Sequence, residues 1–164
     1  MTPERWVVNA SPLILLAKVH HAELLAGLAE HVIVPQAVLD EINAGPPDDP
    51  ARLLLANSPF SIVNVEPSPM IMAWDLGAGE AAVLSFAASN SGWTTVIDDG
   101  AARRCARALG IPLIGTLAVI LRAQQAGLIA AAVPVLKALK TEGIHLDDKV
   151  IRIALSAVCG ESWE

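Results

Sequence analysis

The chain has 164 residues, of which 54% are hydrophobic and 17% are charged, and its formal net charge is −6. This length fits a single domain over residues 1–164 with a well-buried core, and the high apolar fraction excludes an intrinsically disordered chain. The negative charge disfavours a protein that holds duplex DNA by nonspecific attraction. It does not exclude a nuclease, because a metal-binding nuclease site is itself built from acids.

The first predicted strand, 5–9, runs into the stretch VVNASPLILL (7–16), where a small polar cluster interrupts an apolar run. One interpretation is that Ser11 caps the following helix and Asn9 makes the turn. The other is that Asn9 lies at the mouth of a metal site. The sequence of this stretch alone leaves both interpretations open.

The remaining elements alternate along the chain. Further β-branched runs predict strands over 31–35, 60–65, 94–98 and 111–115. Helical patterns cover 12–18, 21–29, 35–44, 79–90, 100–109, 116–127, 131–142 and 147–158, and the Pro- and Asp-rich patch 43–52 is typical of a linker. This alternation predicts an α/β fold with a mainly parallel sheet of about five strands between helices. Ligands of such sheets bind beyond the carboxyl ends of the strands.

Two glutamates lie on predicted helices near that edge. Glu41 falls on the flank of helix 35–44, between an apolar side and a polar side that contains Asp40. Glu80 shares the apolar stripe of its helix with Val83 and Leu84, so its carboxylate points inward and needs a partner. The alternative for each is a solvated side chain; for Glu80, the helix dipole would favour that position.

Asp98 and Asp99 directly follow the residues TTVI, at the end of the predicted strand 94–98. Two adjacent carboxylates repel, so they need a cation, hydrogen-bond donors or open water. Asp is also a favoured helix cap, and one of the pair can cap helix 100–109 while the other binds a metal. On that helix Arg103, Arg104 and Arg107 share one face, which is either a solvated surface or a guide for RNA phosphates.

Two cysteines lie far apart, and the start of the chain shows no apolar signal-peptide segment. Both features favour a reducing, cytoplasmic location. The longest apolar run, near 111–121, is shorter than the about 20 residues that a membrane span needs. The apolar stripe of the last helix (Val150, Ile151, Ala154, Leu155 and Val158) is either core or a dimer contact.

The ordered set NASPLI, VPQAVLDEI, LGAGEAAVLSFA and VIDDGAARRCARALGIPLIGT resembles the PIN-domain family, and most closely its VapC-like group of prokaryotic toxin–antitoxin ribonucleases. The resemblance covers nearly the whole chain. It implies a three-layer fold, Mg²⁺ or Mn²⁺ as cofactor, hydrolysis of RNA phosphodiesters and a cognate antitoxin as partner. It also implies that Glu41, Glu80, Asp98 and Asp99 are site acids, and we expect Glu80 and Asp98 to be direct metal ligands. Glu41 would be a further ligand or would support one, and Asp99 would orient a metal-bound water. Ser11 and Thr116 would be hydroxyl groups near the substrate.

The chain departs from this family pattern at Asn9, where an Asp is usual. An amide oxygen can still ligate a cation or a metal-bound water, although it brings no charge. We therefore expect Asn9 to be a weakened member of the site. One alternative is a catalytically impaired module that binds RNA or protein. A phospho-receiver domain is disfavoured, because its acid pair follows the first strand and not the fourth.

Overall fold

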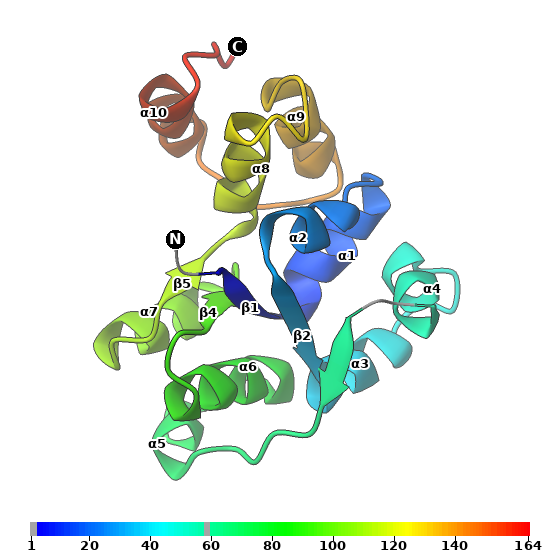
Figure 1. Cartoon of the computed structure of the whole chain (residues 1–164), viewed down its shortest axis with the longest axis vertical. Coiled ribbons are helices and arrows are strands. Elements are labelled where there is room, and N and C mark those ends of the chain that lie inside the picture. Colours follow the sequence, from blue (N-terminus) through cyan, green and yellow to red (C-terminus); the bar gives the residue numbers. More distant parts are fainter. Residues whose placement is uncertain (1–2, 58–59) are drawn as a thin grey trace.

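The computed structural model describes residues 3–57 and 60–164, and these residues form a five-stranded parallel sheet surrounded by ten helices (Figure 1). The strands are β1 (Arg5–Val8), β2 (His31–Pro35), β3 (Ser61–Val63), β4 (Thr94–Val96) and β5 (Leu113–Ile114). The helices are α1 (Ala10–Lys18), α2 (Glu23–Leu28), α3 (Gln36–Asn43), α4 (Pro50–Ala56), α5 (Pro69–Met72), α6 (Ala78–Ser89), α7 (Gly100–Ala108), α8 (Thr116–Gln125), α9 (Val133–Thr141) and α10 (Asp148–Val158). The predicted α/β fold is confirmed.

The central strands are buried along most of their length. Trp6, Val7 and Val8 of β1 are each 0% exposed, and the apolar residues of β2 are buried after His31. A strand with parallel neighbours on both sides and helices on both faces has no solvent side, so it reads as a continuous apolar run. This is why the sequence identified these two strands clearly.

The patch 43–52 is not only a linker, because α4 begins inside it. Asp49 is the N-cap of α4 and accepts a hydrogen bond from the Ala51 N–H at 2.9 Å, while Pro50 takes the first helical position. Asp followed by Pro is a typical helix start, since proline lacks the N–H that would otherwise be unpaired there. The short helix α5 also begins with a proline, Pro69 after Ser68, and was likewise not predicted.

The strand order β3-β2-β1-β4-β5 has a switch point between β1 and β4. From β1 the chain builds outward through β2 and β3, and then returns to build β4 and β5 on the other side. Helix α6 packs against β1, β2 and β4 and also against α3 (Figure 1). Ligands of open parallel sheets bind at the carboxyl ends of the strands that flank such a switch point.

Candidate functional site

Asn9 follows β1 and lies at the switch point. Its N–H donates to the Val96 carbonyl of β4 at 3.1 Å, which joins the ends of the two strands. The residue is 1% exposed, and its side-chain Oδ1 has no hydrogen-bond partner among the described residues. A buried polar atom without a partner costs about 1–3 kcal/mol, so a ligand or water is expected to satisfy it.

The capping interpretation of this stretch is wrong. Helix α1 begins at Ala10, and Asn9 itself occupies the N-cap position without a side-chain capping bond. Ser11 lies inside the first turn of α1 and is partly buried. The Asn9 side chain is therefore turned away from the helix terminus that it could have capped.

Gly79 leaves the space beside Asn9 open. A Cβ atom at this position would lie 3.2 Å from Asn9 Oδ1, 3.4 Å from Val38 Cγ2 and 3.7 Å from Glu41 Oε1. The amide oxygen of Asn9 and the carboxylate of Glu41 thus face the same point on α6. Gly79 was not predicted to be part of the site. A glycine inside a helix costs about 1 kcal/mol relative to alanine, so its presence indicates a local need for space, which here lies beside Asn9 and Glu41.

Glu80 brings a second carboxylate to this place. Burial of the Glu41 carboxyl and, after it, the negative charge of Glu80 raise the pKa of Glu41. Although the Glu41 residue as a whole is exposed, its carboxylate end is the part that lies against Gly79. Glu80 is partly buried in the first turn of α6, on the same stripe as the fully buried Val83 and Leu84, as predicted.

Asp98 is held by Thr116, the first residue of α8. Its Oδ1 accepts a hydrogen bond from the Thr116 N–H at 2.8 Å, and its Oδ2 accepts one from Thr116 Oγ1 at 2.6 Å. Thr116 is 0% exposed. Its hydroxyl, which was expected near the substrate, is therefore donated to an acid of the protein.

Arg103 reaches back from α7 towards the same strand end. Its Nη1 donates to the Ile97 carbonyl at 2.9 Å. A Cβ atom on Gly115 would lie 2.9 Å from Arg103 Nη1 and 3.0 Å from Asp98 Oδ1, so the cation and the carboxylate lie beside the same small residue. Burial and the charge of Arg107 lower the pKa of Arg103, and Asp98 opposes this shift.

The neighbouring predicted residues have other surroundings. Asp99 is the N-cap of α7, and its Oδ2 accepts a hydrogen bond from the Ala102 N–H at 2.9 Å. Arg104 and Arg107 are exposed, in contrast to Arg103. Of the adjacent acids, Asp99 thus caps the helix and Asp98 faces the end of β5.

The acids accordingly form two neighbouring groups. We call Asn9, Glu41 and Glu80 the Asn9 group, and Asp98, Thr116 and Arg103 the Asp98 group. Within residues 3–57 and 60–164, no three His, Cys, Asp or Glu side chains are gathered closely enough to hold a metal ion. The structure brings Asn9 Oδ1 and the Glu41 carboxylate to the same point on α6, and the charge of Glu80 acts on Glu41. Asp98 has its own donors from Thr116.

A family model described as a PIN domain matches residues 5–159 of the chain. The chain belongs to the PIN-domain family. A search of curated proteins found no match. PIN domains are typically metal-dependent nucleases that act on RNA. In the part of this PIN domain that the structure describes, no helix has the length and apolar character to cross a membrane.

The Asn9 group has the chemistry that a divalent cation needs. Mg²⁺ is usually held by one or two carboxylates together with neutral oxygens and waters. Glu41 and Glu80 supply two carboxylates, and the unpartnered Oδ1 of Asn9 supplies a neutral oxygen. A cation there would also relieve the repulsion between the two glutamates. The residues of this PIN domain thus fit a divalent cation at the Asn9 group.

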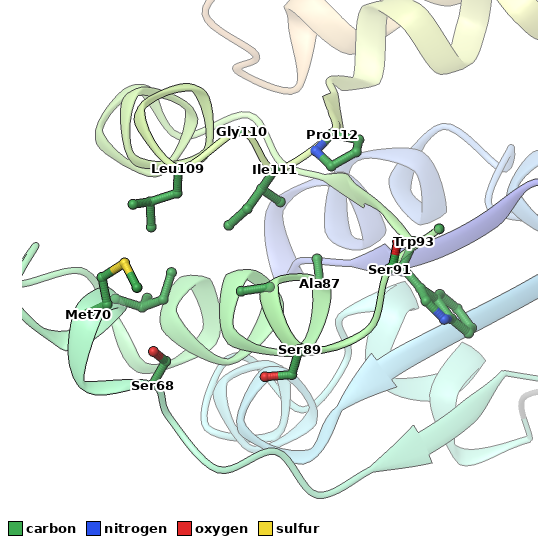
Figure 2. A pocket seen from close by; sticks show the side chains of 13 residues that line it. Ser68, Met70, Ala87, Ser89, Ser91, Trp93, Leu109, Gly110, Ile111 and Pro112 are labelled. Atoms are coloured by element: carbon green, nitrogen blue, oxygen red, sulfur yellow. The ribbon is translucent and has the colours of Figure 1, made fainter.

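A cavity of about 550 Å³ lies elsewhere on the PIN domain (Figure 2). It opens between α5, the end of α6 and the loop before β5, and Met70 and Leu109 face each other across it (Figure 2). Trp93 and Pro112, which precede β4 and β5, place it at the amino ends of the strands. Its lining carries no carboxylate, so this cavity is not the metal site.

Proposed function

We propose that this PIN domain is a divalent-metal-dependent endoribonuclease and the toxin of a toxin–antitoxin pair. The observation that carries the nuclease proposal is the buried, unpartnered Asn9 Oδ1 beside the two carboxylates at the switch point of the sheet. The toxin assignment is supported by the resemblance of the ordered motifs to the VapC-like group. The RNA target of such an enzyme places its action in the cytoplasm.

In this proposal the Asn9 group holds Mg²⁺ or Mn²⁺. A cation held by these residues would supply Lewis-acid chemistry, that is, activation of water and stabilisation of the negative charge that develops on the phosphate. Ser11, two residues after Asn9, and Arg104 on the exposed side of α7 contact the RNA phosphates. Asp99 orients a water with the carboxylate oxygen that does not cap α7.

The Asp98 group has a positioning role in this proposal. Thr116 donates both its N–H and its hydroxyl to Asp98, which fixes the carboxylate at the end of β4. Arg103 donates to the Ile97 carbonyl next to it. With their donors engaged inside the protein, Thr116 and Arg103 act on the substrate through Asp98 and not by direct contact.

The test is cleavage of a fluorogenic RNA with added Mg²⁺ or Mn²⁺. We expect Glu41→Gln and Glu80→Gln each to reduce cleavage by about 100-fold or more, because loss of groups around a bound metal costs activity on this scale. Asp40→Asn is the matched control, since Asp40 lies next to Glu41 on α3 but is exposed and bonded to Gln36. Equal loss in the control and in the Glu41 variant would refute the assignment.

A second candidate function is favoured by the missing charge at Asn9. A module with a neutral residue at this position could bind RNA or a protein partner without cutting. This candidate predicts RNA binding without cleavage in either metal, and it predicts that Asn9→Asp creates a cleaving enzyme. The nuclease proposal predicts cleavage by the natural sequence.

An antitoxin or a second copy needs an apolar surface, and α10 offers one. Ile151 and Leu155 are buried, whereas Val150 is 50% and Ile153 is 61% exposed. The stripe predicted from the sequence is therefore split between core and surface, with Val150 outside the core. Static light scattering at micromolar concentration tests the homodimer: a monomeric mass would refute it.

A further inference from the structure

Positive and negative charge are unevenly distributed between the two groups at the strand ends. Among the residues that the structure describes, no ion pair joins Glu41 or Glu80 to a cationic side chain, and burial and the charge of Glu80 raise the pKa of Glu41. Two carboxylates are the usual complement for one Mg²⁺. The Asn9 group thus has the anionic charge for one divalent cation.

The Asp98 group is already supplied with donors and with a cation. Both carboxylate oxygens of Asp98 accept hydrogen bonds from Thr116. The Arg103 guanidinium lies on the same side of Gly115 as Asp98 and interacts with its charge. Arg103 is anchored to the Ile97 carbonyl at 2.9 Å, so it does not swing away freely. A second divalent cation at Asp98 would therefore meet a fixed positive charge.

Asn9, a member of the Asn9 group, is tied to the strand that precedes Asp98, because its N–H donates to the Val96 carbonyl of β4. In sites with two metal ions the cations are about 3.5–4 Å apart, and anionic ligands between them offset their repulsion. Asn9, which follows β1 and is bonded to β4, has a neutral amide side chain, so it supplies no anionic charge to offset a second cation.

We propose that this PIN domain binds a single divalent cation, held by Asn9 Oδ1, Glu41 and Glu80, and that Arg103 takes the place of a second cation beside Asp98. The inference rests on the proposed nuclease function, because it concerns the metal of that site. It assigns Asn9 as a neutral ligand and Arg103 as a residue that sets the number of bound metals.

The experiment is titration of the full chain with Mn²⁺, followed by isothermal calorimetry and by electron paramagnetic resonance of the free ion. We expect one Mn²⁺ per chain. Arg103→Gln, which removes the charge but keeps an amide donor for the Ile97 carbonyl, is expected to bind two. Arg103→Lys keeps the charge and is expected to bind one. Arg107→Gln is the matched control, because it removes the same charge from an exposed position on α7.

Asn9→Asp tests the other half of the proposal. Adding a carboxylate to the ligand set is expected to tighten Mn²⁺ binding by about tenfold or more, since ligand charge sets the affinity of such sites. Asn9→Ala is expected to weaken it by about tenfold. Thermal unfolding of each variant, compared with the natural sequence, shows that the chain is folded. If Arg103→Gln does not fold, the Mn²⁺ count of the natural chain and the Asn9 variants decide the outcome.

Two Mn²⁺ bound to the natural chain would overturn the inference, as would an unchanged affinity in both Asn9 variants. A count of one in Arg103→Gln would overturn the role of Arg103. RNA cleavage measured on the same samples separates the two proposals. Two bound Mn²⁺ with cleavage would refute only the single-cation inference, whereas one bound Mn²⁺ without cleavage would refute only the nuclease function.

Discussion

The hydrogen bond between Thr116 and Asp98 predicts a measurable coupling in stability. Thr116→Val removes Oγ1, which donates to Asp98 Oδ2 at 2.6 Å, and keeps the shape of the buried side chain. Hydrogen bonds to charged groups contribute about 1.5–3 kcal/mol. Asp98 is only partly buried and keeps the bond from the Thr116 N–H. We therefore take the lower end of the range and expect Thr116→Val to cost about 1.5 kcal/mol.

For a chain of this length, a loss of that size lowers the Tm by about 3–6 °C. Urea unfolding followed by tryptophan fluorescence measures the free energy directly, because Trp6 is fully buried. In an Asp98→Ala background the Thr116 hydroxyl has no carboxylate to bond, so Thr116→Val should change the free energy of unfolding very little. The difference between the two backgrounds gives the coupling of the pair.

Thr95→Val is the matched control. Thr95 is also 0% exposed, but its Oγ1 donates to the neutral Pro112 carbonyl at 2.9 Å. Thr95→Val should lower the free energy of unfolding by about 1 kcal/mol, both in the natural sequence and in the Asp98→Ala background. The reasoning would be refuted if Thr116→Val cost the same in both backgrounds, or less than about 0.5 kcal/mol in the natural sequence.

Three further changes have specific expected results. Gly79→Ala puts a Cβ 3.2 Å from Asn9 Oδ1, so Mn²⁺ affinity should fall by about tenfold by calorimetry; unchanged affinity would place the cation elsewhere. Gly77→Ala puts a Cβ 2.5 Å from Glu80 Oε2, so Mn²⁺ affinity should also fall, with little change in Tm. Burial raises the pKa of Glu161, but the backbone N–H groups of Ala132 and Val133 at the start of α9 donate to its carboxylate and lower the pKa by more. The pKa of Glu161 therefore lies below 4.5. Its stabilisation is thus present at neutral pH and is lost as pH falls below 4.5 through the lowered pKa. Glu161→Gln should cost about 1 kcal/mol at pH 7 by urea unfolding, with a smaller difference near pH 3; a constant difference would contradict this.

The fold could be predicted because its strands are buried on both faces. Runs such as WVV in β1 and VIVP in β2 carry this signal directly. The strand predicted over 60–65 is shorter in the structure, Ser61–Val63, because β3 lies at the edge of the sheet and pairs only with β2. The linker interpretation of 43–52 holds for 44–49 but missed the start of α4, because Asp49 and Pro50 are in the order that starts a helix.

The candidate site could be predicted only in outline. Acids that follow strands or open helices are visible in the sequence, and parallel topology places them at one edge of the sheet. The hydrogen-bond partners and neighbours of these acids cannot be read from the sequence. The bonds from Thr116 to Asp98 join residues far apart in the chain, and they depend on how β4 and β5 pair. The space at Gly79 likewise depends on how α6 meets α3.

The strand order has a consequence for protein synthesis. The two groups at the strand ends draw on residues from Asn9 after β1 to Thr116 after β5, and the Asp98 group is complete only when β5 has paired with β4. A nascent polypeptide that stops short of β5 lacks the donor that fixes Asp98. The full set of residues at the strand ends therefore does not assemble until most of the chain has been translated and folded.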